Sequence, residues 1–209
     1  MKSIKNIFII AFTFFCLTSI FACSMKPGKN TLYTPFPSNN YTNTIELPSE
    51  NMSKVIFVWW RKYKSALPNT LFDNGEVIGA NEIDSFFEYK CNPGKHIFAS
   101  GADLRALDFV EADLLPGHIY YIYTNQVPGW YVTGNIIPVC PTCKNDIWAA
   151  LPKKFNGLKR IELSDKFNPW REKNKEIQTQ MFRDGYEVWL KKQNKNKILP
   201  EYGFKNAIM

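Results

Sequence analysis

The sequence predicts a mainly β fold, an antiparallel β-sandwich with one amphipathic helix near its C-terminus. Runs of β-branched and aromatic residues recur about every ten residues between positions 54 and 139, with turn sequences and no helical pattern between them. After Cys143 the pattern changes, and apolar residues recur at helical spacing from Asn168 onward. Aromatic residues make up 15% of the chain, which is ample material for a sandwich core.

The N-terminus has the three-part layout of a secretion signal. Two lysines form a short basic head, residues 7–21 form an apolar run, and the small residue Ala22 precedes Cys23. Because a helix needs about 20 apolar residues to span a bilayer, this run is too short for a permanent anchor. The four residues that end at Cys23, Ile-Phe-Ala-Cys, resemble the lipobox of bacterial lipoproteins. The resemblance implies cleavage after residue 22 and lipidation of Cys23.

Lipidation of Cys23 would anchor the protein firmly to the membrane surface through its acyl chains. The resemblance implies two or three acyl chains, and each buried methylene contributes ~0.8 kcal/mol. Ser24 stands where Asp is the usual signal for retention at the inner membrane, so we expect the outer membrane, with the domain facing the periplasm. Residues 23–53 are rich in Pro, Asn, Ser and Thr, which is typical of a flexible tether.

Length and charge limit the function classes. Removing residues 1–22 from the 209 leaves 187, enough for one good-sized domain with an appendage. Two lysines leave with the signal, so the formal net charge falls from +7 to +5. Beside 19 acidic residues this balance does not indicate a nucleic-acid partner. It is compatible with attraction to anionic lipid head groups or glycan polymers.

The sandwich is expected over residues 54–139, a size similar to that of immunoglobulin and transthyretin domains. The predicted strands span residues 54–61, the hairpin 70–80, and residues 85–91, 95–100, 107–114, 118–124 and 131–139. The turns between them carry Asp73-Asn74-Gly75, Asn92-Pro93-Gly94, Pro116-Gly117 and Pro128-Gly129. The first of these is the strongest hairpin signal, and the second is also hairpin-like.

A C-terminal extension, residues 140–209, is expected to contain a helix over about residues 169–192. Asn168 suits the N-cap and Pro169 the first helical position. The predicted apolar stripe consists of Trp170, Ile177, Met181 and Val188 or Trp189. We expect this stripe to cover one sheet or one sheet edge, with a partner protein as the alternative.

Two adjacent tryptophans, Trp59 and Trp60, end the first predicted strand. Neighbouring residues in a strand face opposite sides, so both cannot lie in the core of a two-layer sandwich. We expect one of them to lie outside or under the C-terminal helix. An exposed aromatic cluster is the alternative, and it would suit a glycan or protein partner.

Residues 54–139 carry a set of turn and core signatures: a first strand ending in Arg61, the segment Ala66-Leu67-Pro68, the Asp73-Asn74-Gly75 hairpin with Gly79, the turn Pro93-Gly94-Lys95-His96, and Tyr120-Tyr121 in a late strand. In these features the segment resembles bacterial lipoproteins that carry domain of unknown function 2846. The resemblance implies a small lipid-anchored β-domain without an established activity. It supplies no catalytic residues.

Three cysteines remain after cleavage and lipidation: Cys91, Cys140 and Cys143. In an oxidising compartment we expect a structural disulfide, either between Cys140 and Cys143 or from Cys91 to one of them. The Cys-x-x-Cys spacing also suits a thiol-redox site. That chemistry normally follows the central strand of a βαβ unit, and no such unit is predicted here.

A zinc site and a hydrolase active site are two further alternatives for this chain. A zinc site would need all three with His96 or His118, but apart from the Cys-x-x-Cys pair the spacing is irregular. Hydrolase chemistry has no recognisable nucleophile motif.

The sequence therefore predicts a lipid-anchored envelope lipoprotein without enzymatic activity, cofactor or metal, acting as an interaction or structural module for an envelope protein or glycan. The alternative is a periplasmic thiol-redox protein that uses Cys140 and Cys143.

Overall fold

A computed structural model describes part of the chain. The described residues are 33–35, 45–60, 68–102, 106–127, 133–143, 146–193 and 195–206, all within one compact unit, Thr31–Met209. The predicted signal (residues 1–22), the lipidation site Cys23 and the tether up to residue 44, apart from residues 33–35, lie outside them. No helix in these ranges combines the length and apolar character that a bilayer crossing needs.

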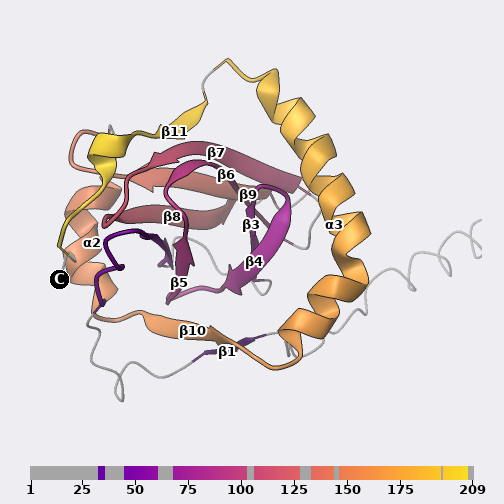
Figure 1. Cartoon of the computed structure of the whole chain (residues 1–209), viewed down its shortest axis with the longest axis horizontal. Helices are drawn as coiled ribbons and strands as arrows, with labels where there is room; N and C mark the ends of the chain where they lie inside the picture. The colour runs from indigo at the N-terminus through magenta and orange to yellow at the C-terminus, as the bar shows by residue number, and fades with distance from the viewer. Residues whose placement is uncertain are drawn as a thin grey trace, which may run out of the picture. The chain divides into compact units, whose positions relative to one another are not determined.

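Two β-sheets form the centre of the domain (Figure 1). The first has the strand order β1-β10-β5-β2-β8-β9, and the second has the order β11-β7-β6-β3-β4. The strands are β1 (Tyr33–Pro35), β2 (Ser53–Trp59), β3 (Asn69–Asp73), β4 (Glu76–Asn81), β5 (Ser85–Cys91), β6 (Gly94–Ala102), β7 (Ala106–Leu114), β8 (Ile119–Val127), β9 (Thr133–Val139), β10 (Lys159–Leu163) and β11 (Asn196–Ile198). The prediction of a mainly β sandwich with a C-terminal helix is confirmed.

The turn between two consecutive strands either pairs them as a hairpin in one sheet or carries the chain from one sheet to the other. At Asn74 and Gly75 both φ angles are positive, 49° and 91°, as a two-residue hairpin turn requires, and β3 pairs with β4. The second predicted hairpin, at Asn92-Pro93-Gly94, is wrong, because β5 belongs to the first sheet and β6 to the second. The turn at residues 115–118 also crosses between the sheets.

These crossings change some strand directions. After the turn at residues 115–118, β8 pairs with β2 and runs parallel to it, whereas the sequence predicted antiparallel pairing throughout. The pairs β10–β5 and β11–β7 are also parallel, and both join segments far apart in the chain. Only strands joined by short turns within one sheet are forced to be antiparallel.

Each sheet is buried on both faces. Along β2, Val55 and Phe57 point into the sandwich, and Ile56 and Val58 point outward, yet all four are fully buried. The outward residues pack under helix α2 (Ile147–Phe155). The domain therefore has apolar layers outside the sandwich as well as within it.

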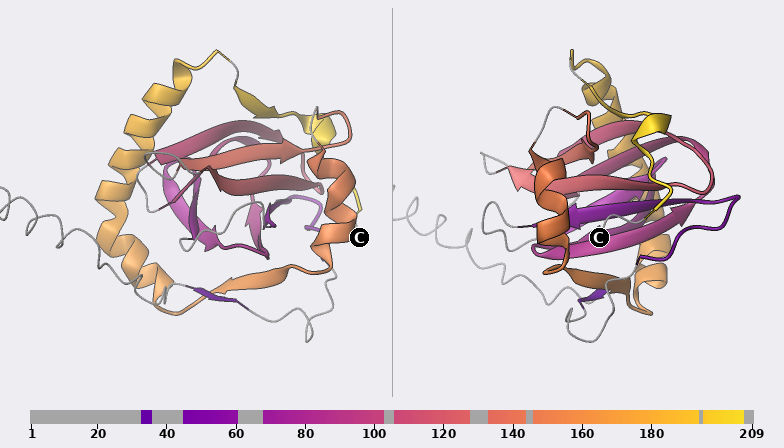
Figure 2. Two further views of the ribbon diagram at one scale, coloured as in Figure 1. Left: turned by 180° about the vertical axis from the view of Figure 1, so that it is seen from behind. Right: turned by 90° about the vertical axis from the view of Figure 1, so that its left-hand side faces the viewer.

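The second sheet is covered from the other side. Helix α3 (Phe167–Leu190) packs Phe182 on Phe72 and Phe109, with ring centroids 5.9 and 5.2 Å apart. Figures 1 and 2 show α2 and α3 on opposite sides of the two sheets. The predicted helix is thus present within two residues of its expected ends, and it covers one sheet as expected.

The stripe by which α3 packs differs from the prediction. Phe167, Gln178, Phe182 and Trp189 are buried. Of the predicted stripe, Trp189 is buried and Trp170 packs half-buried against the same cluster. By contrast Ile177 is 59% exposed, and Val188, the alternative to Trp189, is 64% exposed. The polar Gln178 was missed as a member of this stripe, because apolar spacing alone favoured its neighbour Ile177.

Trp59 and Trp60 do lie on different sides. Trp59 is 2% exposed, whereas Trp60 is half-buried and packs against the cluster beneath α2, with its ring 4.6 Å from that of Tyr123. The covering helix is therefore α2 and not the long C-terminal helix. Cover by α2 leaves no free tryptophan pair at this position.

The folded domain extends beyond the predicted range 54–139 at both ends. Ile45, placed in the tether by sequence, is 3% exposed and packs in the cluster under α2. In the C-terminal extension, β10 joins the first sheet and β11 joins the second. The extension is therefore part of the sandwich.

Candidate functional site

The interior of the sandwich is polar at both ends and apolar in the middle. On β3 the inward positions are Asn69, Leu71 and Asp73, and on β6 His96 and Phe98 also face inward. Because side chains alternate along a strand, the polar residues at each end of β3 and β6 meet between the two sheets. One end has an open cleft of about 500 Å³, which we call the Asp73 cleft.

Asp73 is the centre of a hydrogen-bonded cluster in this cleft. His96 Nδ1 donates to both carboxylate oxygens at 2.9 Å, and the Tyr89 hydroxyl donates to Oδ2 at 2.9 Å. Asp73 and His96 are 8% and 9% exposed. The cluster connects the end of β3 with the end of β5 and the start of β6, so it fastens the two sheets together at this end.

Both ring nitrogens of His96 face acceptors. Nε2 lies 2.8 Å from the carbonyl oxygen of Asn92, and Nδ1 faces the Asp73 carboxylate. A neutral imidazole can donate from only one nitrogen, so the protonated ring fits this site best. Burial lowers the pKa of His96, but the hydrogen bond and charge of Asp73, together with the Asn92 carbonyl, raise it overall.

Cys91 lies at the same end and stays protonated. Burial, followed by the negative charge of Asp73, raises the pKa of its thiol to about 12. Its Sγ lies 4.0 Å from the carbonyl oxygen of Ser53. Burial and the Asp73 charge also raise the pKa of Tyr89. A thiol with so high a pKa is not a nucleophile at neutral pH.

The opposite end holds a cluster of buried amides and hydroxyls. Asn81 Nδ2 donates to Thr124 Oγ1 at 2.8 Å, and Gln126 Nε2 donates to Asn69 Oδ1 at 3.2 Å. Within the described part of the chain, Asn69 Nδ2 and Ser100 Oγ are buried without a protein partner. Buried polar atoms of this kind usually bind an ordered water.

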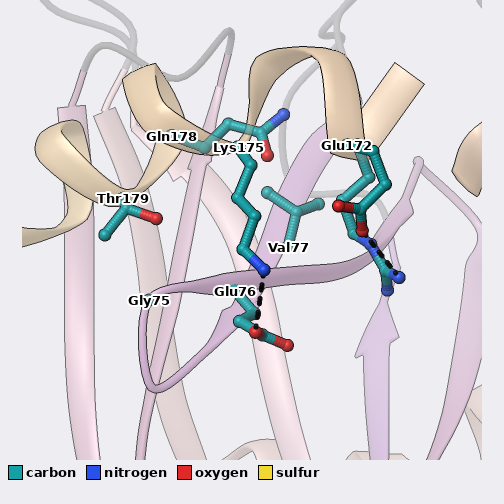
Figure 3. A pocket seen from close by; sticks show the side chains of 8 residues that line it. Gly75, Glu76, Val77, Glu172, Lys175, Gln178 and Thr179 are labelled. Carbon is teal, nitrogen blue, oxygen red and sulfur yellow. Dashed lines mark hydrogen bonds and ion pairs between the residues drawn. The ribbon is translucent and has the colours of Figure 1, made fainter. Parts of the chain in front are cut away.

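A second hollow, of about 140 Å³, lies between α3 and the β3–β4 turn (Figure 3). Lys175 points from α3 toward Glu76, with Nζ 3.8 Å from the carboxylate, and Arg171 lies 3.4 Å from Glu172. The charges of these four groups balance. Gln178, 1% exposed, lines the hollow, and its Nε2 has no partner among the described residues. The arrangement favours small polar molecules such as water over a charged ligand.

Cys140 and Cys143 form a disulfide, so of the expected pairings the one within the Cys-x-x-Cys segment is the one present. Cys91 forms no disulfide. The first sulfur of the pair, on Cys140, is fully buried and Cys143 is half-buried. The pair follows β9, an edge strand of the first sheet, and α2 begins only at Ile147. A redox enzyme needs an accessible first thiol at a helix start, and this arrangement does not provide one.

The residues considered for zinc do not come together. The disulfide occupies two of the three cysteines, and His118 bonds locally, its Nδ1 lying 2.7 Å from the carbonyl oxygen of Pro116. No group of three or more His, Cys, Asp or Glu side chains in the described ranges could share a metal ion.

Sequence reasoning did not identify Asp73 and Tyr89 as site residues. Asp73 was interpreted only as part of a turn signal, although it stands two residues after Leu71 and so shares its inward face. The same parity joins His96 to Phe98. Side chains alternate between the two faces along a strand. If this alternation had been followed to the strand ends, it would have placed Asp73 and His96 on the inward face.

Comparisons with protein-family models, curated proteins and solved structures find no match to this chain.

Proposed function

We propose that this chain is a lipid-anchored envelope lipoprotein without enzymatic activity, held at the outer membrane through Cys23 and facing the periplasm. The observation that carries the proposal is the N-terminal pattern, a basic head and apolar run that end at Ala22 and Cys23. We include the resemblance to lipoproteins with domain of unknown function 2846 in this proposal, on the turn and core signatures of residues 54–139.

The Asp73 cleft supports a binding or structural role over a catalytic one. A general base needs a free nitrogen near the substrate, and both nitrogens of His96 are already engaged. A nucleophile needs a thiolate, and the pKa of Cys91 is about 12. The exposed side chains at the rim, Asn74, Lys90 and Asn92, are hydrogen-bonding groups. They suit an envelope protein or glycan as the partner.

The intact mass of membrane-extracted protein tests the anchor. We expect, without reduction, the mass of residues 23–209 plus two or three acyl chains, and one thiol that is alkylated after denaturation. The matched control is Cys23→Ser, which should stay unacylated and leave the membrane fraction. Cys91→Ser should keep the lipid and lose the alkylated thiol. An unmodified full-length mass, or a Cys23→Ser protein that still carries acyl chains, would overturn the proposal.

A further inference from the structure

Strand β10 has an outer edge, on the side away from β5, along which only the short strand β1 lies among the described residues. Only Lys159 and Arg160 pair with β5, opposite Ser85 and Phe86. Beyond Arg160 the strand runs on toward α3 through residues 161–163 (Figure 1). Within the described part of the chain, the only strand that pairs with these three residues is β1.

Side chains hold this edge in an extended conformation. Ile161 is 2% exposed in the sandwich core, and Leu163 packs half-buried against the core and against the cluster under α3. Glu162, between them, is exposed. The strand is therefore fixed by its alternate side chains, while its backbone donors and acceptors still need a partner. Such an edge is a ready acceptor for another extended strand.

We infer that the outer edge of β10 is a strand-binding site whose occupant is this chain's own tether. β1, residues 33–35, lies antiparallel to β10, with Tyr33 opposite Leu163, Thr34 opposite Glu162 and Pro35 opposite Ile161. Addition of an extended peptide to a sheet edge is a common mode of peptide recognition. In this protein the peptide comes from the segment between the lipid site and the domain.

The tether sequence limits the pairing to a few residues. Pro35 and Pro37 have no backbone N–H, so the segment cannot extend the ladder of hydrogen bonds past this point. Proline also blocks the free outer edge of β1 against a further strand. A pairing of three residues is short enough to open and close.

The consequence of the pairing rests on the proposed lipid anchor. With β1 paired, Tyr33 lies ten positions along the chain from Cys23, a reach of at most about 35 Å. With β1 released, the next packed residue is Ile45, 22 positions along the chain from Cys23, a reach of at most about 75 Å. The edge of β10 thus sets how far from the membrane the domain extends.

A cysteine pair placed in register tests the pairing. The full chain with Thr34→Cys and Glu162→Cys places two thiols directly opposite, a position at which a disulfide can form. The matched control is Thr34→Cys with Lys159→Cys, three residues along the strand and about 10 Å away. We expect an intramolecular disulfide between positions 34 and 162, found by peptide mass without reduction, in about tenfold higher yield than in the control.

Two other outcomes of the cross-linking overturn the inference. Equal yields in the two variants would mean that the segment samples β10 without register. A disulfide-linked dimer would mean that the occupant comes from a second copy. The same pair combined with Cys23→Ser separates this inference from the lipoprotein proposal, because strand pairing does not need the lipid. If the disulfide forms while the wild-type chain is not acylated, the binding edge stands and only the anchor fails.

Discussion

Asp73→Ala should be among the most destabilising single substitutions in this domain. The carboxylate accepts from His96 and Tyr89, and its removal leaves a buried imidazolium and a phenol without their partner. Removal of one member of a buried ion pair costs about 3–5 kcal/mol. Two hydrogen bonds to a charged group, at about 1.5–3 kcal/mol each, give a similar sum. Asp73 and His96 are both at least nine-tenths buried, so screening by solvent is small.

Urea unfolding followed by tryptophan fluorescence measures this cost. The matched control is Glu76→Ala, an acid on the same hairpin that is 65% exposed and should change stability by less than about 0.5 kcal/mol. If Asp73→Ala costs no more than Glu76→Ala, then the cluster does not hold the sheets together and our reasoning is wrong.

The same cluster predicts a pH dependence of known sign. The pKa of His96 is raised by folding, so its contribution is complete below the unfolded value of about 6.5 and is lost as pH rises through the folded value. The pKa of Cys91 is about 12 and that of Tyr89 is raised, so neither group titrates near neutrality. The stability advantage of wild type over His96→Gln should therefore be larger at about pH 5.5 than at about pH 9. An equal advantage at both would contradict the assignment of an imidazolium.

Three further substitutions test the packing and the disulfide. Gly134→Ala places a methyl group 2.1 Å from the carbonyl oxygen of Ser100, so it should cost several kcal/mol or prevent folding, as thermal unfolding would show. Phe182→Ala should cost about 3–5 kcal/mol in urea unfolding, whereas Ile177→Ala should cost less than about 0.5 kcal/mol, and the reverse order would contradict the position of α3. Cys140→Ser should lower stability by about 2 kcal/mol because the disulfide closes a short loop, and it should abolish any thiol-disulfide exchange if the redox alternative holds.

The strands between residues 53 and 139 were predictable from the sequence because their pattern is local, whereas β1, β10 and β11 were not predicted. β5 lies at its predicted bounds, and the Asn74-Gly75 turn imposes the expected hairpin whatever surrounds it. The direction of pairing was not predictable, because the turn after Cys91 looks the same whether it closes a hairpin or crosses between sheets. That choice is made by the total burial of both faces, which no single segment encodes.

The candidate site was less predictable than the fold. His96 stood out as a rare residue, but its partner Asp73 was hidden in a turn signal. Their meeting depends on β3 and β6 being neighbours in the second sheet. In α3 the polar Gln178 is buried and Ile177 is exposed, so a search for apolar periodicity chose the wrong one of these two neighbours. Both errors concern polar residues whose burial only the tertiary arrangement makes possible.

The parallel pairs contributed by β10 and β11 have a consequence for folding kinetics. β11 forms one edge of the second sheet, and β10 lies next to the edge strand β1 of the first sheet, where it pairs with a strand more than 70 residues earlier in the chain. Contacts this distant in sequence make folding slow, because loop closure must precede any gain from pairing. Neither sheet has all of its described strands until residues 159–163 and 196–198 are available, so we expect folding to finish late in synthesis. For the exported lipoprotein that we propose, this delay keeps the chain unfolded while it crosses the membrane.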